Sequence, residues 1–337
     1  MNAGNDDMNY VFVLGIMPRS GTHYLRNLLC LHPECVESAL PEDGLVARSN
    51  ILMNYVTANY QGWEYVGDLP EIEANELLAE ELGQGVLSFL KKARCRAIER
   101  NVLPPAMHGL KQGAKYMIAK TPLVNNLKNF FSLFPKEKLL VLVRDGRSIV
   151  ESNNVSFGVN REEAIREWAT AARHIFNMKK KWDAEGRQFL IVKYEELYQN
   201  TDREMKNILT FLGLDADKYD FDKALNVPVV GSSVFKRNGG EVHWNPVEKT
   251  SEFNPINRSA GWTRWQHERF NWLAENELTL FGYEPVKFKR GGLFIGLRNH
   301  ACDFMYAVRL WSRRFRKLTY FVVKRLKLHF KNSNKGS

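Results

Sequence analysis

The segment that most restricts the fold begins with an apolar run and continues into a short polar loop. The run Val-Phe-Val-Leu at 11–14 predicts a buried strand, and the loop Pro-Arg-Ser-Gly-Thr at 18–22 precedes an expected helix. Gly21 lets the backbone curl, Ser20 and Thr22 offer hydroxyl donors, and the helix start supplies free N–H groups and its positive dipole end. The segment therefore predicts an anion site with room for two adjacent negative groups.

The loop differs from the phosphate-binding loop of ATP- and GTP-hydrolysing proteins. Gly15 and Gly21 lie one residue too far apart, and no lysine stands between Gly21 and Thr22. Arg19 precedes the glycine instead, and a guanidinium suits a planar spread of oxygens. Without the Lys-Ser/Thr pair, the usual arrangement for a magnesium-bound β,γ-phosphate is missing. We therefore do not expect a nucleoside triphosphate here; the remaining alternative is an ordinary strand, turn and helix.

A second segment supports the anion site. Residues 138–143, Lys-Leu-Leu-Val-Leu-Val, have the pattern of a buried strand, and Arg144 follows at the carboxyl end. Open α/β sheets bind ligands at the carboxyl ends of their strands. Arg144 and Ser152 are eight residues apart, so a turn from strand to helix brings both towards one phosphate. Lys120 lies upstream, and Tyr194 ends another short strand pattern downstream.

Six short motifs in this order resemble those of sulfotransferases that use 3′-phosphoadenosine-5′-phosphosulfate (PAPS), especially the bacterial and Golgi-type carbohydrate and tyrosylprotein branch. They span residues 10 to about 285. Each motif alone is weak, and the six in order are a strong signal. The motifs are Pro-Arg-Ser-Gly-Thr (18–22), Lys-Thr-Pro (120–122), Arg-Asp-Gly-Arg (144–147) with Ser152, Tyr-Glu-Glu-Leu (194–197), Phe-Leu-Gly (211–213) and Arg-Ser-Ala-Gly-Trp (258–262).

The resemblance implies where the parts of PAPS bind. The loop at 18–23 is expected to hold the 5′-phosphosulfate, and Tyr194 to lie near the adenine. Arg144, Ser152 and Arg258 are expected to hold the 3′-phosphate. Two separated anionic groups need two cationic clusters, and an adenine needs an aromatic or apolar face. The implied cofactor-binding residues are Arg19, Ser20, Gly21, Thr22, His23, Arg144, Ser152, Tyr194 and Arg258.

The implied reaction passes a sulfuryl group in line from PAPS to an acceptor hydroxyl or amine and leaves 3′-phosphoadenosine-5′-phosphate (PAP). Negative charge then grows on the bridging oxygen of the departing phosphate, and fixed cations must meet it. Arg19 and Lys120 are the catalytic candidates, and removing one such donor costs roughly a hundred- to a thousandfold in rate. The reaction needs no metal.

The base that takes the acceptor proton is predicted on a loop after the first helix. Cytosolic members of the family have a histidine where this chain has Pro122, so another residue must act. Glycan and tyrosylprotein members use a carboxylate after the first helix, and Glu42 is the first candidate. Asp43 is second because the register is uncertain by one residue, and Glu37 and His108 follow. The alternative for Glu42 is a solvated loop acid, since carboxylates are mostly exposed.

The sequence leaves the acceptor open between a glycan, a lipid and a small molecule with a hydroxyl. Residues 45–118 are expected to shape the acceptor pocket, and residues 226–260, which contain several glycines and prolines, to close over the nucleotide.

A different class of function is a P-loop nucleotide kinase or a non-catalytic nucleotide-binding module on the same scaffold. PAP binding that survives EDTA favours the transferase, and magnesium-dependent ATP turnover favours the kinase.

Length and composition predict one large domain with an extension. The chain has 337 residues, and 44% of them are hydrophobic. Apolar strand patterns alternate with amphipathic helices, which predicts an α/β fold with a P-loop-like, mainly parallel sheet flanked by helices. We expect a PAPS-dependent sulfotransferase domain at 1–286 and a basic amphipathic helical extension at 287–337.

The charge of the extension separates it from the rest of the chain. Residues 287–337 contain 14 lysines and arginines and one acid, Asp303, while the remainder has 34 basic and 37 acidic residues. The net charges are therefore +13 and −3. Apolar residues recur three and four apart, which predicts one apolar stripe along a helix with most basic residues off it. The stripe consists of Phe304, Val308, Trp311, Phe315, Leu318 and Val322.

Three interpretations of this extension remain open. Attachment to an anionic membrane is favoured, because basic amphipathic helices with aromatics lie in membrane interfaces. Packing on the catalytic domain or pairing in a homodimer is the second, since the spacing also suits a coiled coil. Nucleic-acid binding is the least favoured, and no nucleic-acid partner is expected.

The sequence also predicts a location. Residues 1–9 are polar, and no uninterrupted apolar run reaches about 18 residues. We expect a cytoplasmic protein, peripheral at the inner face of the membrane. The four cysteines are then expected to be reduced thiols.

Overall fold

The computed structural model describes residues 8–38, 40, 42–61, 71–100, 114–228, 230, 246, 248, 253–288 and 293–333. The chain divides into two compact units. The first consists of Met1–Trp262 and Leu273–Glu284, and the second of Thr263–Trp272 and Pro285–Ser337. A boundary between a catalytic domain and a tail at residue 286 stays a prediction.

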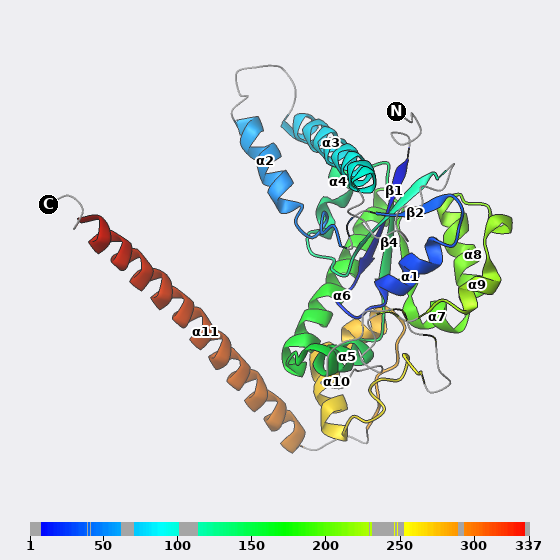
Figure 1. Ribbon diagram of the computed structural model, residues 1–337. Coiled ribbons are helices and arrows are strands. Elements are labelled where there is room, and N and C mark those ends of the chain that lie inside the picture. Colours follow the sequence, from blue (N-terminus) through cyan, green and yellow to red (C-terminus); the bar gives the residue numbers. More distant parts are fainter. Residues whose placement is uncertain are drawn as a thin grey trace. The chain divides into compact units, whose positions relative to one another are not determined.

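The first unit is built on a five-stranded parallel sheet (Figure 1). Strand β1 lies in the centre of the sheet, between β3 and β4, which both come later in the chain. The α/β class and the parallel sheet predicted from the apolar runs are confirmed. The order across the sheet is β2 (Cys35–Glu37), β3 (Tyr116–Thr121), β1 (Asn9–Gly15), β4 (Lys138–Val143) and β5 (Leu190–Lys193).

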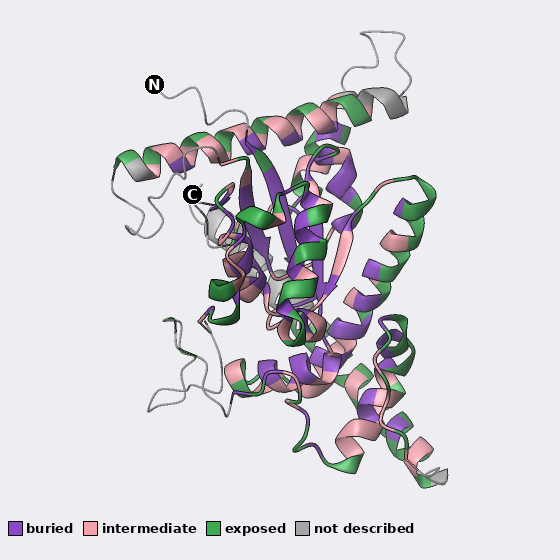
Figure 2. Ribbon diagram, turned by 90° about the vertical axis from the view of Figure 1, so that its right-hand side faces the viewer, coloured by how far each residue is buried: buried purple, intermediate pink, exposed green. Residues whose placement is uncertain are grey.

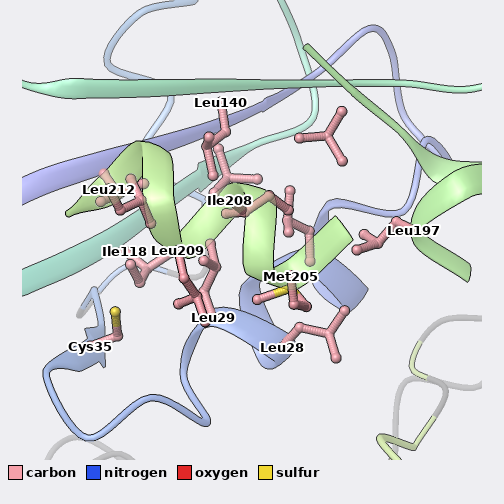
Figure 3. Close-up of a cluster of buried hydrophobic side chains, with 14 of the residues drawn as sticks. Leu28, Leu29, Cys35, Ile118, Leu140, Leu197, Met205, Ile208, Leu209 and Leu212 are labelled. Carbon is pink, nitrogen blue, oxygen red and sulfur yellow. The ribbon is translucent and has the colours of Figure 1, made fainter. Parts of the chain in front are cut away.

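Alternate residues of β1 face opposite layers of helices. On one face Val11 and Val13 belong to a buried cluster with leucines of α1 (Thr22–Leu29) and α8 (Thr201–Leu212) (Figure 3). Helices α7 (Tyr194–Gln199) and α9 (Phe221–Leu225) also contribute to this cluster. The sheet is therefore covered by α1 and α7 to α9 on this side, as Figure 1 shows.

Aromatic side chains fill the opposite face of the sheet. The ring of Phe12 lies 5.3 Å from that of Phe130 and 4.9 Å from that of Phe134, between centroids. Phe131 contacts Trp182 at 4.6 Å. These residues place the short helices η2 (Leu127–Asn129) and α4 (Phe130–Leu133) and the long helix α6 (Arg161–Ala184) against the sheet. Figure 2 shows the strands buried between the two layers.

Two further helices follow β2 along the chain. They are α2 (Asn50–Gln61) and α3 (Glu71–Glu99). Arg94 of α3 donates to the carbonyl of Glu37 at 2.9 Å, which ties the helix to the edge strand β2. Whether this region shapes an acceptor pocket stays a prediction, since 101–113 lie outside the described residues.

The connections of the sheet create a crevice at the carboxyl ends of β1 and β4. From β1 the chain passes through α1 to one side of the sheet, whereas β4 and β5 lie on the other side. This reversal is the place where open α/β sheets bind ligands. Helix α5 (Gly146–Phe157) starts beyond β4 and is capped by the carboxylate of Asp145, which accepts from the N–H of Arg147. The short η3 (Ala216–Lys218) follows α8.

The second unit joins the first part of α10 (Arg264–Leu280) to α11 (Leu293–Ser333). Arg269 donates to the Asn299 side chain at 3.0 Å and to Asp303 at 2.6 Å. The helix predicted in the basic extension is confirmed by α11. In the part of the chain that the structure describes, no helix has both the length and the apolar character needed to cross a membrane.

Candidate active site

A cavity of about 500 Å³ opens where the loops after β1 and β4 meet. All of the predicted site residues except Ser20 and Lys120 line it. Both exceptions are buried directly behind the wall, and Lys120 contacts two residues that line the cavity. The fold thus brings the sequence-predicted residues into one place.

The loop after β1 is held in a conformation that favours glycine at one position. Gly21 has φ of 103° and precedes α1 without a side-chain cap, and Arg19 also has a positive φ of 77°. A Cβ atom on Gly21 would lie 2.4 Å from the ring of Tyr194, so the ring and the loop are in close contact. The first turn of α1 and its positive dipole end therefore lie at this loop.

Arg144 connects the loop after β4 to the loop after β1. One of its terminal nitrogens donates to the carbonyl of Arg19 at 2.6 Å, and the other donates to the carbonyl of Pro255. Its guanidinium lies 4.4 Å from the centroid of the Tyr194 ring. Arg144 and Tyr194 are thus stacked at the centre of the cavity wall.

Arg19 and Ser152 contact each other directly. The Nε of Arg19 donates to the hydroxyl of Ser152 at 3.0 Å. The resemblance places Arg19 with the 5′-phosphosulfate and Ser152 with the 3′-phosphate. In the structure the two predicted subsites therefore share a boundary at this hydrogen bond, which the sequence did not indicate.

Three arginines raise the positive potential of this end of the cavity. Burial and the neighbouring charge of Arg144 lower the pKa of Arg19 to about 10, and they lower the pKa of Arg258 to about 10 as well. Burial also raises the pKa of Tyr194 to about 12. Because the guanidinium groups repel one another, a bound anion between them would relieve the repulsion.

Lys120 is the centre of a second polar cluster, at the end of β3. Its ammonium donates to Glu42 Oε1 at 2.8 Å and to His23 Nε2 at 2.9 Å. The side chain of Lys120 is 1% exposed, whereas that of Glu42 is 49% exposed and faces the cavity. Burial lowers the pKa of Lys120, and the Glu42 carboxylate opposes this shift.

His23 is a neutral member of this cluster. Burial and the charge of Lys120 lower the pKa of His23 to about 3. An ammonium can only donate, so Nε2 of the ring accepts, and the proton of the neutral imidazole lies on Nδ1. The sequence predicted His23 as a contact of the phosphosulfate; its contact with Lys120 was not foreseen.

The other candidates for the base are placed differently. Asp43 is buried, and its Oδ1 accepts from the Thr121 hydroxyl at 3.1 Å and the Leu45 N–H at 2.9 Å. Its Oδ2 has no hydrogen-bond partner among the described residues, and burial raises the pKa of this carboxyl group. Glu37 pairs with Arg26, and His108 lies outside the described residues.

Two groups in the cavity wall were missed by sequence reasoning. Asn153 donates to the carbonyl of Pro18 at 2.9 Å and so ties α5 to the loop after β1. Tyr198 stacks on Tyr194 with ring centroids 6.1 Å apart. The spacing of four residues on one helix was the available signal for the tyrosine pair. Among the described residues there is no group of three or more His, Cys, Asp or Glu side chains that would hold a metal ion.

The sequence is similar to those of known sulfotransferases. The model of a family described as "Sulfotransferase family" matches residues 10–218. Protein-tyrosine sulfotransferase 2 of Gallus gallus is 28% identical over 218 residues, which cover 62% of this chain and 52% of that protein. Protein-tyrosine sulfotransferase 1 of Danio rerio is 27% identical over 218 residues, covering 62% and 54%. The chain spans about half the length of these curated relatives.

A solved structure also resembles the chain. The sulfotransferase domain from the Synechococcus PCC 7002 olefin synthase is 16% identical, with 89% of this chain and 96% of that chain covered. The TM-score between the two chains is 0.41.

Proposed function

The chain belongs to the sulfotransferase family, and from this premise we propose that it transfers a sulfuryl group from PAPS to an acceptor hydroxyl and releases PAP. The observation that carries the proposal is the cluster of Arg19, Arg144 and Arg258 at the carboxyl ends of β1 and β4, in which Arg144 is buried and the other two are half-buried. Arg19 and Arg144 donate to a hydroxyl and to carbonyl groups, none of which carries a negative charge. A ligand with several anionic groups suits such a site.

Buried polar atoms support the fit of PAPS to this cavity. The hydroxyl of Ser20 and the Nε of Arg144 are buried and have no hydrogen-bond partner among the described residues. Both are donors, one in the loop after β1 and the other at the carboxyl end of β4. PAPS would supply the sulfuryl group, the 3′-phosphate and the adenine. The loop Arg19, Ser20, Gly21, Thr22 and His23 would hold the phosphosulfate, Arg144, Ser152 and Arg258 the 3′-phosphate, and Tyr194 the adenine.

Lys120 and Arg19 are the proposed catalytic cations. The Lys120 ammonium is fixed by Glu42 and His23, and Arg19 is fixed by Ser152. Fixed donors need little reorganisation when negative charge develops on a departing oxygen. Their buried positions lower the local dielectric and so strengthen this stabilisation.

Glu42 is the proposed base for the acceptor proton. Its carboxylate lies at the cavity wall, is half-exposed and is held at one oxygen by Lys120. Asp43 instead holds the loop, because its Oδ1 accepts from the Thr121 hydroxyl, which in turn accepts from the Gly44 N–H at 3.0 Å. An acceptor entering the cavity therefore meets Glu42 before Asp43.

The acceptor is proposed only as a compound with a hydroxyl. A glycan, a lipid and a small molecule remain candidates, and the names of the two relatives add a protein tyrosine. Family membership speaks against the alternative of a nucleotide kinase. A cytoplasmic location, a homodimer and the absence of a nucleic-acid partner stay predictions.

The test combines binding and transfer. PAP should bind to the purified full chain in the presence of EDTA, and PAPS should be converted to PAP when candidate hydroxyl compounds are added. The acceptor is then identified by mass spectrometry as a compound that gains one sulfuryl group. Magnesium-dependent ATP turnover without PAP binding would overturn the proposal.

A further inference from the structure

Helix α11 exposes an apolar face that the catalytic proposal does not use. Its members are 48 to 85% exposed, although they are large hydrophobic side chains. They recur at steps of three, four or seven residues, apart from one adjacent pair, and therefore lie on one side of the helix. We define the apolar face of α11 as Phe294, Leu297, Phe304, Met305, Val308 and Trp311.

The opposite side of α11 contacts the first part of α10, which belongs to the same second unit. Asn299 is buried and accepts from Arg269, and Asp303 accepts from both Arg269 and the Trp272 indole, the latter at 2.9 Å. His300 packs edge-on against the Trp272 ring at 4.9 Å. Because α10 contacts α11 through these polar residues, the apolar face is not the contact surface between the two helices.

The charge around the apolar face has one sign. Residues 287–337 carry 14 basic side chains and the single acid Asp303, which pairs with Arg269. Arg309 and Arg316 are exposed and follow the apolar residues along the helix. The rest of the chain has a net charge of −3, so the positive charge is concentrated on this segment.

We propose that the apolar face of α11 lies in the interface of an anionic lipid bilayer, with the helix parallel to the surface. The apolar side chains would enter the boundary between headgroups and acyl chains, and the basic side chains would contact anionic headgroups. A second copy fits less well, because two segments with a net charge of +13 each would be brought together. Nucleic acid would use the charge and leave the apolar face exposed. This inference goes beyond sulfuryl transfer and does not depend on it.

The test uses the full chain and two vesicle compositions. In low salt it should sediment with vesicles of phosphatidylcholine and phosphatidylglycerol and remain in solution with vesicles of phosphatidylcholine alone. Neutralising Arg309 and Arg316 as R309Q and R316Q should weaken binding about fivefold for each charge. High salt should weaken it as well, because surface charges are then screened.

A matched pair of variants tests the apolar part. Phe304→Ser should weaken vesicle binding roughly tenfold. Phe89→Ser changes the same residue type on α3, where Phe89 is 67% exposed against 71% for Phe304, and should leave binding unchanged. Circular dichroism and PAP binding, measured for each variant, should match those of the unaltered chain. Retained PAP binding separates a failure of this inference from a failure of the proposed function.

Other outcomes would overturn the inference. If the full chain ignores phosphatidylglycerol vesicles in low salt, or if Phe304→Ser and Phe89→Ser behave alike, the apolar face does not contact lipid. If ultracentrifugation shows a dimer that Phe304→Ser dissociates, and vesicles do not bind, the face joins two copies. If duplex DNA displaces the vesicles and binds the Phe304→Ser variant undiminished, the basic residues serve nucleic acid.

Discussion

The cavity has basic side chains at both ends, but their hydrogen-bond acceptors differ: uncharged groups at one end and a carboxylate at the other. At one end Arg19 and Arg144 donate to a hydroxyl and to carbonyl groups, and burial together with the charge of Arg144 lowers the pKa of Arg19 and of Arg258. At the other end Lys120 is paired with Glu42 at 2.8 Å and contacts the neutral His23. Among the described residues, three arginines gather at the first end, whereas at the second the ammonium of Lys120 is matched by the Glu42 carboxylate.

From this difference we expect the arginine end to bind the nucleotide and the lysine end to take part in proton transfer. An excess of charge favours a ligand with several anionic groups, and it would stabilise any carboxylate nearby in its ionised form. A base must lie close to the reacting group and exchange a proton with it. Glu42 lies at the lysine end of the cavity, where its carboxylate pairs with Lys120 at 2.8 Å. We therefore expect changes at the lysine end to affect turnover and changes at the arginine end to affect nucleotide affinity.

The largest effect is expected at the lysine end. Glu42→Gln should reduce turnover roughly a hundred- to ten-thousandfold, the range for a general base, with PAP affinity close to that of the unaltered chain. Stopped assays of PAP release and calorimetric PAP titrations would measure the two quantities. Glu196→Gln is the matched control, because Glu196 is 44% exposed and paired with Arg203 on the surface. Unchanged turnover in Glu42→Gln would move the role to Asp43 or His108.

At the arginine end the expected effect is on affinity. Arg144→Ala should weaken PAP binding roughly ten- to a hundredfold, since hydrogen bonds to charged groups are lost. Adenosine 5′-phosphosulfate lacks the 3′-phosphate and should lose much less. Arg147→Ala is the control from the same turn, where Arg147 pairs with Asp145 at 2.6 Å. Equal losses for both nucleotides would contradict the assignment of Arg144 to the 3′-phosphate.

A pair of glycine variants tests how closely the loop after β1 packs against the Tyr194 ring. Gly21 and Gly158 both have positive φ, 103° and 66°, so alanine should cost about 1–2 kcal/mol at either position. Only at Gly21 would the new Cβ meet the Tyr194 ring, which should add about 1–3 kcal/mol. Urea unfolding of the two variants measures the difference. Equal losses of stability would show that the ring moves aside freely.

A last prediction concerns acid stability. His23 has a pKa of about 3 in the folded chain and an ordinary value of 6.5, so the unfolded chain binds more protons between these values. The free energy of unfolding should therefore fall as the pH falls from 6.5 towards 3. His23→Gln keeps an acceptor for Lys120 and should show a shallower fall in urea titrations at several pH values. Identical slopes would show that His23 is not buried as a neutral ring.

Local sequence patterns predicted the strands and the loop that position the site. The apolar runs at 11–14 and 138–143 predicted strands buried on both faces, and both are inner strands of the parallel sheet. The glycine at 21 predicted a loop conformation that the structure shows as a positive φ. These predictions succeed because strand burial and backbone conformation depend on a few consecutive residues.

Such local patterns do not predict contacts between residues that are far apart in the sequence. Arg19 and Ser152 are 133 residues apart, and Lys120 and His23 are 97 residues apart. The resemblance assigned Arg19 and Ser152 to different phosphates, and no local signal indicates that they hydrogen-bond to each other. Their roles in catalysis and binding stay predictions that the variants above would test.

The sequence by itself determined the strand, loop and helix after residue 10, the concentration of 14 basic residues at 287–337 and the apolar stripe among them. Each of these is a property of neighbours along the chain. The tertiary structure alone decided which side chains share the cavity, because the parallel register sets Val13 beside both Lys120 and Leu140. It also decided the protonation of His23, since burial and the charge of Lys120 lower the pKa of a ring that is otherwise ordinary.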